Sequence, residues 1–159
     1  MGPNETSKGT FTLTPESAAA CLAAYQKEGV RLIVDLNHDS LDPNALAMRS
    51  DASDARGWFS LQLRTDGLWA TDVAWTPDGE RRLREKTQAY ISPAFEHDDE
   101  GVVMAIANAA LCAMPATYGA PALVAASKRD DGVTGALVEV CKALLVHVVS
   151  HRKVKNGSR

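Results

Sequence analysis

Hydrophobic and polar positions alternate along residues 57–65 and again along 68–76, which is the period of a β-strand with one buried face. The pair Asp66-Gly67 separates the two stretches and is a strong signal for a β-hairpin, because this turn needs a positive φ. The pattern therefore predicts two antiparallel strands joined by a tight turn. Their apolar faces would carry Phe59, Leu61 and Leu63 on the first strand and Trp69, Val73 and Trp75 on the second.

Three further stretches favour β-strands because of their β-branched and aromatic residues. The first, residues 30–38, has the sequence VRLIVDLNH and ends at His38. The second, residues 89–97, has the sequence AYISPAFEH and contains Ser92. The third, residues 101–114, has the sequence GVVMAIANAALCAM. We expect a strand there, although its alanines leave a helix as the competing interpretation.

Helix signals are clearest after Thr14, which suits an N-cap and is followed by Pro15 at the first helical position. This helix should end at Gly29, since glycine commonly terminates helices. A short charged helix is predicted near residues 78–87, and a longer one over residues 134–150. The last would have one apolar side, formed by Leu137, Val140, Cys141, Leu144 and Val148.

The remaining segments complete a one-domain organisation. Residues 1–10 are polar, and we expect a flexible leader there, before a single domain over residues 11–150. Residues 151–159 form a basic tail that is expected to be frayed. Residues 39–56 form a polar connection with four Asp, and a long loop without structure in a compact domain is usually functional or mobile. The order of elements predicts an α+β fold, mostly β with surrounding helices.

Composition narrows the class of protein. A chain of 159 residues with 45% hydrophobic and 23% charged positions can bury one core, and is neither a disordered chain nor a membrane protein. The net charge of -3 argues against nucleic acid as the main partner. The first residues lack the apolar segment of a secretory signal, and no apolar run is long enough to span a bilayer.

The three cysteines, Cys21, Cys112 and Cys141, are an odd number and lie far apart in the sequence. This arrangement favours buried thiols in a reducing compartment over a disulfide framework or a zinc site. Cys112 lies in the apolar run ALCAM, where burial would raise the thiol pKa and make it a poor nucleophile. We expect all three side chains to lie in the core.

Serine and histidine supply the remaining candidate chemistry. No zinc, calcium or phosphate-loop motif occurs, so no metal or cofactor is expected. A serine attacks at neutral pH only when a neutral imidazole takes its proton. His38 and Ser92 both fall in predicted strands, which would hold them rigidly, but on their own a structural role for both is the simpler interpretation. His147 and His151 are expected to be structural.

Six pieces of sequence appear in a recognisable order: His38 with acidic neighbours, Gly57, Gly67-Leu68, the charged helix near 78–87, Tyr90 to Phe95 in YISPAF, and Met114-Pro115-Ala116. In this order they resemble the prohead proteases of tailed phages, and most of all the I-protein family of Mu-like phages and prophages. The similarity covers roughly residues 15–125.

The resemblance implies a small antiparallel β-barrel of the herpesvirus-assemblin type, wrapped by helices. It also implies a serine endopeptidase, with Ser92 as nucleophile and His38 as base. In related proteases a third residue, often acidic, orients the histidine, and the matching position here is Asn108. An amide can orient an imidazole but cannot offset its positive charge. Asp35, near the end of the strand before His38, is the alternative third residue.

The resemblance also implies a setting: the bacterial host cytoplasm, within the assembling prohead. The expected substrates and partners are phage scaffold and major capsid proteins and the protease itself, and a homodimer is a further expectation because related viral proteases often dimerise. The strand expected before the first helix is reduced to GTFTL, so either the barrel is incomplete or the chain starts late. Relatives often carry a C-terminal scaffolding segment, whereas this sequence ends at Arg159, which fits a protease-only, self-processed or trimmed form. The alternative function is a catalytically inactive capsid-assembly or scaffold-binding protein with the same fold.

Overall fold

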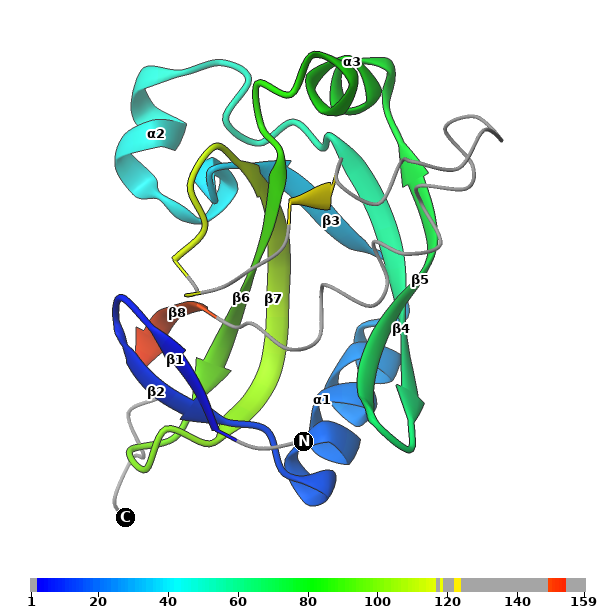
Figure 1. Cartoon of the computed structure of the whole chain (residues 1–159), viewed down its shortest axis with the longest axis vertical. Coiled ribbons are helices and arrows are strands. Elements are labelled where there is room, and N and C mark those ends of the chain that lie inside the picture. Colours follow the sequence, from blue (N-terminus) through cyan, green and yellow to red (C-terminus); the bar gives the residue numbers. More distant parts are fainter. Residues whose placement is uncertain (1–2, 117, 119–121, 124–148, 154–159) are drawn as a thin grey trace.

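A mixed six-stranded sheet forms the centre of this computed structural model, which describes residues 3–116, 118, 122–123 and 149–153. Its strands are β3 (Leu32–Leu36), β4 (Gly57–Arg64), β5 (Gly67–Trp75), β6 (Tyr90–His97), β7 (Val103–Cys112) and β8 (Val149–Lys153). They lie in the order β5-β4-β3-β7-β6-β8 (Figure 1). A second sheet is the hairpin of β1 (Pro3–Thr6) and β2 (Gly9–Thr12).

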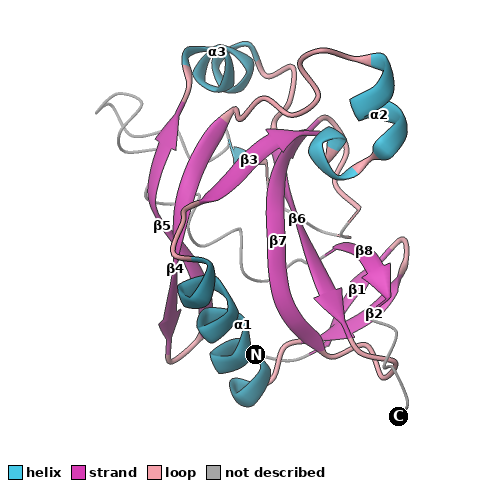
Figure 2. Ribbon diagram, turned by 180° about the vertical axis from the view of Figure 1, so that it is seen from behind, coloured by secondary structure: helices cyan, strands magenta, loops and turns pink. Residues whose placement is uncertain are grey.

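Each of the three described α-helices begins with a capping side chain followed by a proline. They are α1 (Pro15–Glu28), α2 (Pro43–Met48) and α3 (Pro77–Glu85), capped by Thr14, Asp42 and Thr76. The cap oxygen satisfies an unpaired N–H of the first turn, and proline has no N–H to satisfy there. In Figures 1 and 2, α1 lies at one end of the sheet, and α2 and α3 lie at the other. None of the described helices combines the length and apolarity needed to cross a membrane.

The local predictions for the first helix and for the strands and turn of the hairpin are confirmed. The helix α1 ends at Gly29, whose φ of 67° is the left-handed conformation expected of a terminating glycine. Strands β4 and β5 pair antiparallel around the turn before Gly67, which carries the positive φ. The segment containing Asn108 is the strand β7, so the competing helix is wrong. These elements depend on neighbouring residues, which is why local patterns found them.

The face predicted for the second strand of the hairpin, β5, is wrong at Trp69, because Leu68 and Ala70 are the buried residues there. A register shift between Trp58 and Ser60 then brings Val73 and Trp75 to the apolar core.

The connection over residues 39–56 is not the unstructured loop that its polar composition predicted. It contains a short 3-10 helix, η1 (Asp39–Leu41), and then α2. The signal for α2 is present in the pair Asp42-Pro43, since the Asp42 side chain accepts a hydrogen bond from Asn44 N at 2.9 Å. Six residues are too few to show a hydrophobic period, so only the cap marked this helix.

The chain ends also differ from the sequence predictions. Most of the expected flexible leader, residues 1–10, lies in the β1–β2 hairpin, because the two strands pair with each other from Pro3 to Thr12. Residues 149–153, expected to end a helix and begin a frayed tail, form β8 and pair with β6. Pairing with distant residues overrides local preference at this point. The rest of the predicted helix, residues 134–148, lies outside the described residues.

The α+β class is confirmed, but the sheet is mixed and not the antiparallel barrel implied by the resemblance. Strand β3 runs parallel to β7, and β6 runs parallel to β8. Within the described residues the pairings begin at β5 and end at β8, so they do not close into a barrel. The parallel pair arises because the chain leaves β3 on one side, through the β4–β5 hairpin, and returns through α3 and β6. Strand β7 then inserts on the free side of β3.

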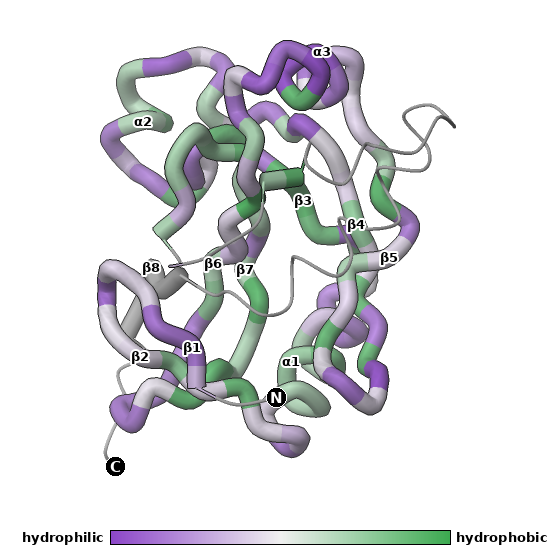
Figure 3. Tube along the Cα trace, in the orientation of Figure 1, coloured by the Kyte–Doolittle hydropathy of each residue, from purple (hydrophilic) through white to green (hydrophobic). Residues whose placement is uncertain are grey.

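Two groups of apolar side chains fill the space beside the sheet. One lies between the central strands and includes Val34, Phe59, Ala109 and Leu111. The other joins α1 to the strand ends and includes Cys21. Figure 3 shows the hydrophobic colour concentrated on the central strands, while α3 is mostly hydrophilic. The sheet is therefore held by its apolar face, and its other face can carry polar groups.

Candidate active site

Strand register places a row of polar residues on one face of the sheet. Asp35 on β3 lies opposite Ala110 on β7, and Ala110 lies opposite Ser92 on β6. Residues paired across strands point to the same face, so Asp35 and Ser92 share a face with one alanine between them. Val34 precedes Asp35 and Ala109 precedes Ala110, and both point the other way, into the apolar core. Alternation with period two thus separates the polar face from the core.

Asn108 lies on the same face as this row. It is two residues before Ala110 on β7 and pairs with Ala94 on β6. It is therefore a diagonal neighbour of Ser92, at a spacing of roughly 7–8 Å between Cα atoms. The side chains of Asp35, Asn108 and Ser92 are almost entirely buried, with residue exposures of 0%, 1% and 4%. Buried polar groups must find hydrogen-bond partners, so their contacts should be specific.

His38 reaches this face through an unusual backbone. Asn37 and His38 have φ values of 54° and 63°, so two successive non-glycine residues adopt the left-handed conformation directly after β3. Such residues cost of order 1–3 kcal/mol each and persist where the surrounding structure holds them. Two backbone hydrogen bonds hold this turn, from Asn37 N to Leu111 O at 3.0 Å and from Leu41 N to His38 O at 3.0 Å. The turn brings His38 Nδ1 to 3.0 Å from Asn108 Oδ1.

A carboxylate stands behind the amide of Asn108. Asn108 Nδ2 donates to Asp35 Oδ2 at 3.0 Å and to Ser40 Oγ at 3.0 Å. Asp35 Oδ2 also accepts from Ser40 N at 2.9 Å and from Ser40 Oγ at 2.5 Å. We call Asp35, His38, Ser40 and Asn108 the inner network. It connects the carboxylate of β3 to the imidazole through one side-chain amide.

The structure thus brings His38 and Asn108 into contact. Asp35 contacts the amide of Asn108 on the side away from His38. Which of the two is the third catalytic residue stays a prediction. Ser92 lies on the same face, one strand from Asn108, and its pairing with His38 stays a prediction. Ser40 was missed by sequence reasoning, although the run HDS places it only two residues after His38.

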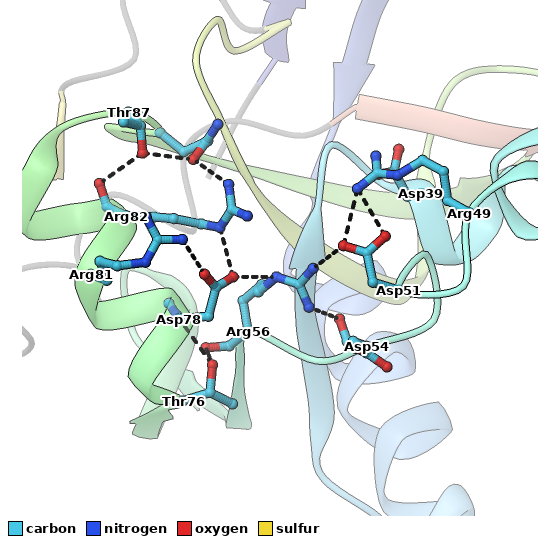
Figure 4. A network of polar contacts seen from close by, with 12 residues as sticks. Asp39, Arg49, Asp51, Asp54, Arg56, Thr76, Asp78, Arg81, Arg82 and Thr87 are labelled. Atoms are coloured by element: carbon cyan, nitrogen blue, oxygen red, sulfur yellow. Dashed lines mark hydrogen bonds and ion pairs between the residues drawn. The ribbon is translucent and has the colours of Figure 1, made fainter.

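A second set of polar contacts holds the connection between β3 and β4. Arg56 is buried, and its guanidinium lies 3.0 Å from Asp51 Oδ2 and 2.8 Å from Asp78 Oδ2 at the start of α3 (Figure 4). Helix α3 packs closely there, since a Cβ on Gly79 would lie 2.1 Å from Arg56 O. We call this set the outer network. Its members are Asp39, Arg49, Asp51, Arg56, Asp78, Arg81 and Arg82.

The described cysteines and the other described histidines offer less to catalysis. Burial raises the pKa of the Cys21 thiol to about 12 and that of Cys112 to about 11, so the core positions predicted for both are confirmed. His97 packs against Phe11 and Phe95. Within the described ranges no group of three or more His, Cys, Asp or Glu side chains has metal-binding geometry. Cys141 and His147 lie outside the described residues, and His151 is part of β8.

Comparison with known protein families decides the relationship. The model of the Mu-like prophage I protein, N-terminal domain, matches residues 1–124. The chain belongs to this family. The match includes Asp35, His38, Ser92 and Asn108, and it confirms the resemblance drawn from the order of motifs. The family is one of prohead maturation proteases. No curated protein and no solved structure matches the chain significantly.

Proposed function

We propose that this chain is a serine endopeptidase that cleaves scaffold and capsid proteins, and itself, during maturation of a phage prohead. The observation that carries the proposal is the buried contact of 3.0 Å between His38 Nδ1 and Asn108 Oδ1, on the sheet face that also bears Ser92. A base held by a neutral side-chain amide occurs in cysteine proteases of the papain type. Membership of the family supports the same assignment.

In the proposed reaction His38 Nε2 takes the proton of Ser92 Oγ as that oxygen attacks the carbonyl carbon of the scissile bond. The carbonyl π electrons move to the oxygen, and backbone N–H groups stabilise the resulting oxyanion. When the tetrahedral intermediate collapses, the C–N bond breaks and His38 gives its proton to the leaving amine. Water then attacks the acyl-enzyme, with His38 again as base, and the reaction releases the acid and restores Ser92.

Small residues around Ser92 favour this role. Two of its neighbours on the same face are small: Ala110, directly opposite on β7, and Ala94, two residues along β6, whereas Tyr90 lies two residues back along β6. Neither alanine has side-chain atoms beyond Cβ, so neither fills the space that an imidazole would need beside the hydroxyl. Large residues at these positions would block that approach. A barrel of the assemblin type stays part of the proposal, with the mixed strand pairing described above in place of a purely antiparallel one.

The setting of the reaction is proposed on the same basis. The substrates would be phage scaffold and major capsid proteins within the assembling prohead in the host cytoplasm. A homodimer is proposed as the working assembly, because related viral proteases often dimerise. Its test is the molecular mass in solution, measured by light scattering, and a monomer at working concentration would contradict it.

Cleavage in the presence of natural substrates tests the activity. The chain is co-expressed with its cognate scaffold and capsid proteins, and the products are identified by mass spectrometry. We expect cleavage by the wild type and none by Ser92→Ala or His38→Ala, because each removes one of the reacting groups. Ser60→Ala, a serine on strand β4 of the same sheet, is the matched control and should cleave normally. Cleavage by Ser92→Ala at the wild-type rate would refute the proposal.

A second candidate function is supported by the burial of the site. Ser92 and His38 are only 4% and 7% exposed, and Asn108 replaces the acidic residue common in related proteases. Both facts suit an inactive capsid-assembly or scaffold-binding protein that keeps the fold. A fluorophosphonate probe separates the two in the assembled state. Labelling that disappears in Ser92→Ala and His38→Ala supports the protease, and absence of labelling in a concentrated sample supports the assembly role.

A further inference from the structure

We infer that Asp35 and Ser40 are positioning residues that set the hydrogen-bonding state of His38 through the amide of Asn108. The inference rests on the proposed function for its catalytic meaning, but its structural content can be measured in the resting protein. The sequence suggested Asp35 only as an alternative to Asn108, and it did not suggest Ser40. The inference gives Asp35 a different place, behind Asn108.

The orientation of the Asn108 amide follows from its neighbours. On one side it faces Asp35 Oδ2 and Ser40 Oγ, both at 3.0 Å. The Ser40 hydroxyl proton is directed at Asp35 Oδ2, at 2.5 Å, so Ser40 Oγ can only accept from the amide. Two acceptors require the NH₂ group of Asn108 on this side, where both of its protons are used. The amide oxygen must then face His38.

The amide oxygen in turn determines which ring nitrogen of His38 carries a proton. Asn108 Oδ1 can only accept a hydrogen bond, so His38 Nδ1, at 3.0 Å, must be the donor. In a neutral imidazole with a proton on Nδ1, the lone pair lies on Nε2. A general base that serves Ser92 needs its lone pair on that nitrogen. The carboxylate of Asp35 therefore selects the reactive tautomer of His38 through two successive hydrogen bonds, from Asn108 to Asp35 and from His38 to Asn108.

Asp35 also supplies the negative charge that Asn108 lacks. It is fully buried, and in the described part of the chain no Lys or Arg forms an ion pair with it. Three donors converge on its Oδ2: Ser40 N, Ser40 Oγ and Asn108 Nδ2. A carboxylate in this place would stabilise the positive imidazolium that forms during the reaction. The asparagine would thus transmit the orientation, and Asp35 would provide the charge.

A different role is that the inner network only satisfies buried polar groups. The two roles differ in what Asp35→Asn does. Its side-chain oxygen would take the place of Oδ2, because Ser40 N and Asn108 Nδ2 both donate to that position, and its NH₂ group would take the place of Oδ1. This variant keeps the orientation of Asn108 and removes the charge. Asp35→Ala and Asn108→Ala remove the orientation itself, since nothing then holds an amide oxygen against His38.

The test measures the tautomer of His38 by long-range ¹H–¹⁵N NMR in protein labelled at histidine, with His38→Gln used to assign the signals. We expect the Nδ1–H form in the wild type and in Asp35→Asn. We expect a shift toward the Nε2–H form in Asp35→Ala and in Asn108→Ala. Asp42→Asn is the matched control: it removes one carboxylate from the same connection, and its amide oxygen can still cap α2. It should leave the tautomer unchanged.

Any of three results overturns the inference: an Nε2–H form in the folded wild type, or a wild-type tautomer in folded Asp35→Ala or in folded Asn108→Ala. If Asp35→Ala does not fold, an Nε2–H form in the wild type still overturns it. In the cleavage assay we expect kcat to fall about tenfold in Asp35→Asn and about 100-fold or more in Asn108→Ala, with KM nearly unchanged. A wild-type kcat in Asp35→Asn would contradict the role given to its charge. Failure of the proposed function shows separately, as cleavage that survives Ser92→Ala with the Nδ1–H form still present.

Discussion

The inner and outer networks begin within five residues of each other, at Asp35 and Asp39, yet they use aspartate in different ways. In the inner network one carboxylate, fully buried, directs an amide and through it an imidazole. In the outer network carboxylates of 35–44% side-chain exposure surround the buried guanidinium of Arg56. Water can replace a lost partner in the second case but not in the first. Both networks contain aspartates, so the residue type does not explain the difference. A carboxylate determines the orientation of its hydrogen-bond partners when it is buried.

Asp35→Ala should have the largest effect on stability in either network. Ser40 N, Ser40 Oγ and Asn108 Nδ2 would all lose their common acceptor in a buried site. An unsatisfied buried donor costs about 1–3 kcal/mol, and some relaxation will reduce the sum, so we expect a loss of about 3 kcal/mol. Urea denaturation of the folded chain measures this value. A loss below the error of the measurement would mean that water enters the site, and the comparison would fail.

Arg56→Met should cost less, although Arg56 is also buried. The substitution keeps most of the apolar stem and removes the cation between Asp51 and Asp78. Both carboxylates are partly exposed and can be hydrated instead, so we expect a loss of about 2 kcal/mol in the same denaturation experiment. The tautomer of His38 should not change. A changed tautomer would show that Arg56 influences the inner network, which would contradict the treatment of the two networks as independent.

Asp78→Asn should have a smaller effect that depends on pH. Hydrogen bonding by Arg82 and Arg81, and the charges of Arg82 and Arg56, lower the pKa of Asp78 from its usual value of 3.8. A lowered folded-state pKa means that the stabilisation is complete above the unfolded-state pKa and is lost as pH falls through the folded-state value. We expect the variant to be about 1 kcal/mol less stable at pH 7. Denaturation curves should converge once the pH has fallen below the lowered folded-state pKa of Asp78; a difference that persists in strong acid would contradict this account.

Arg81→Ala should have the smallest effect. Its guanidinium pairs with Asp78 and Glu85 on the surface of α3, and all three side chains are substantially exposed. Exposed pairs contribute little because water and salt compensate for them. The expected change in unfolding midpoint lies within experimental error at physiological salt. A clear loss that disappears in high salt would show that the outer network works as one cooperative unit.

Several elements could be derived from the sequence because their causes are local. Thr14 and Pro15 begin α1, Gly29 ends it, and alternation outlines β4 and β5. The order of motifs also led to His38, Ser92 and Asn108 as candidates and to the family that was confirmed. The short helix α2 escaped because a cap without a hydrophobic period is a weak signal.

The arrangement of the site, in contrast, depends on contacts between distant residues. Nothing in the run LIVDLNHDS indicates that Asp35 will meet Asn108, because that contact needs the parallel pairing of β3 with β7. The same pairing decides which face of the sheet is polar. The left-handed turn at Asn37 and His38 has only a weak local signal, since Asn and His adopt a positive φ more often than most residues other than glycine but still rarely.

The sequence by itself determined α1, the β4–β5 hairpin, the family and the residue types available for chemistry. Only the tertiary structure decided that Asp35 and Ser40 stand behind Asn108, and that Asn108 stands behind His38. The physical reason is that hydrogen bonds among side chains require positions within about 3 Å, and such positions are set by strand register across the sheet. A register shift of one residue would turn the same side chains to the other face.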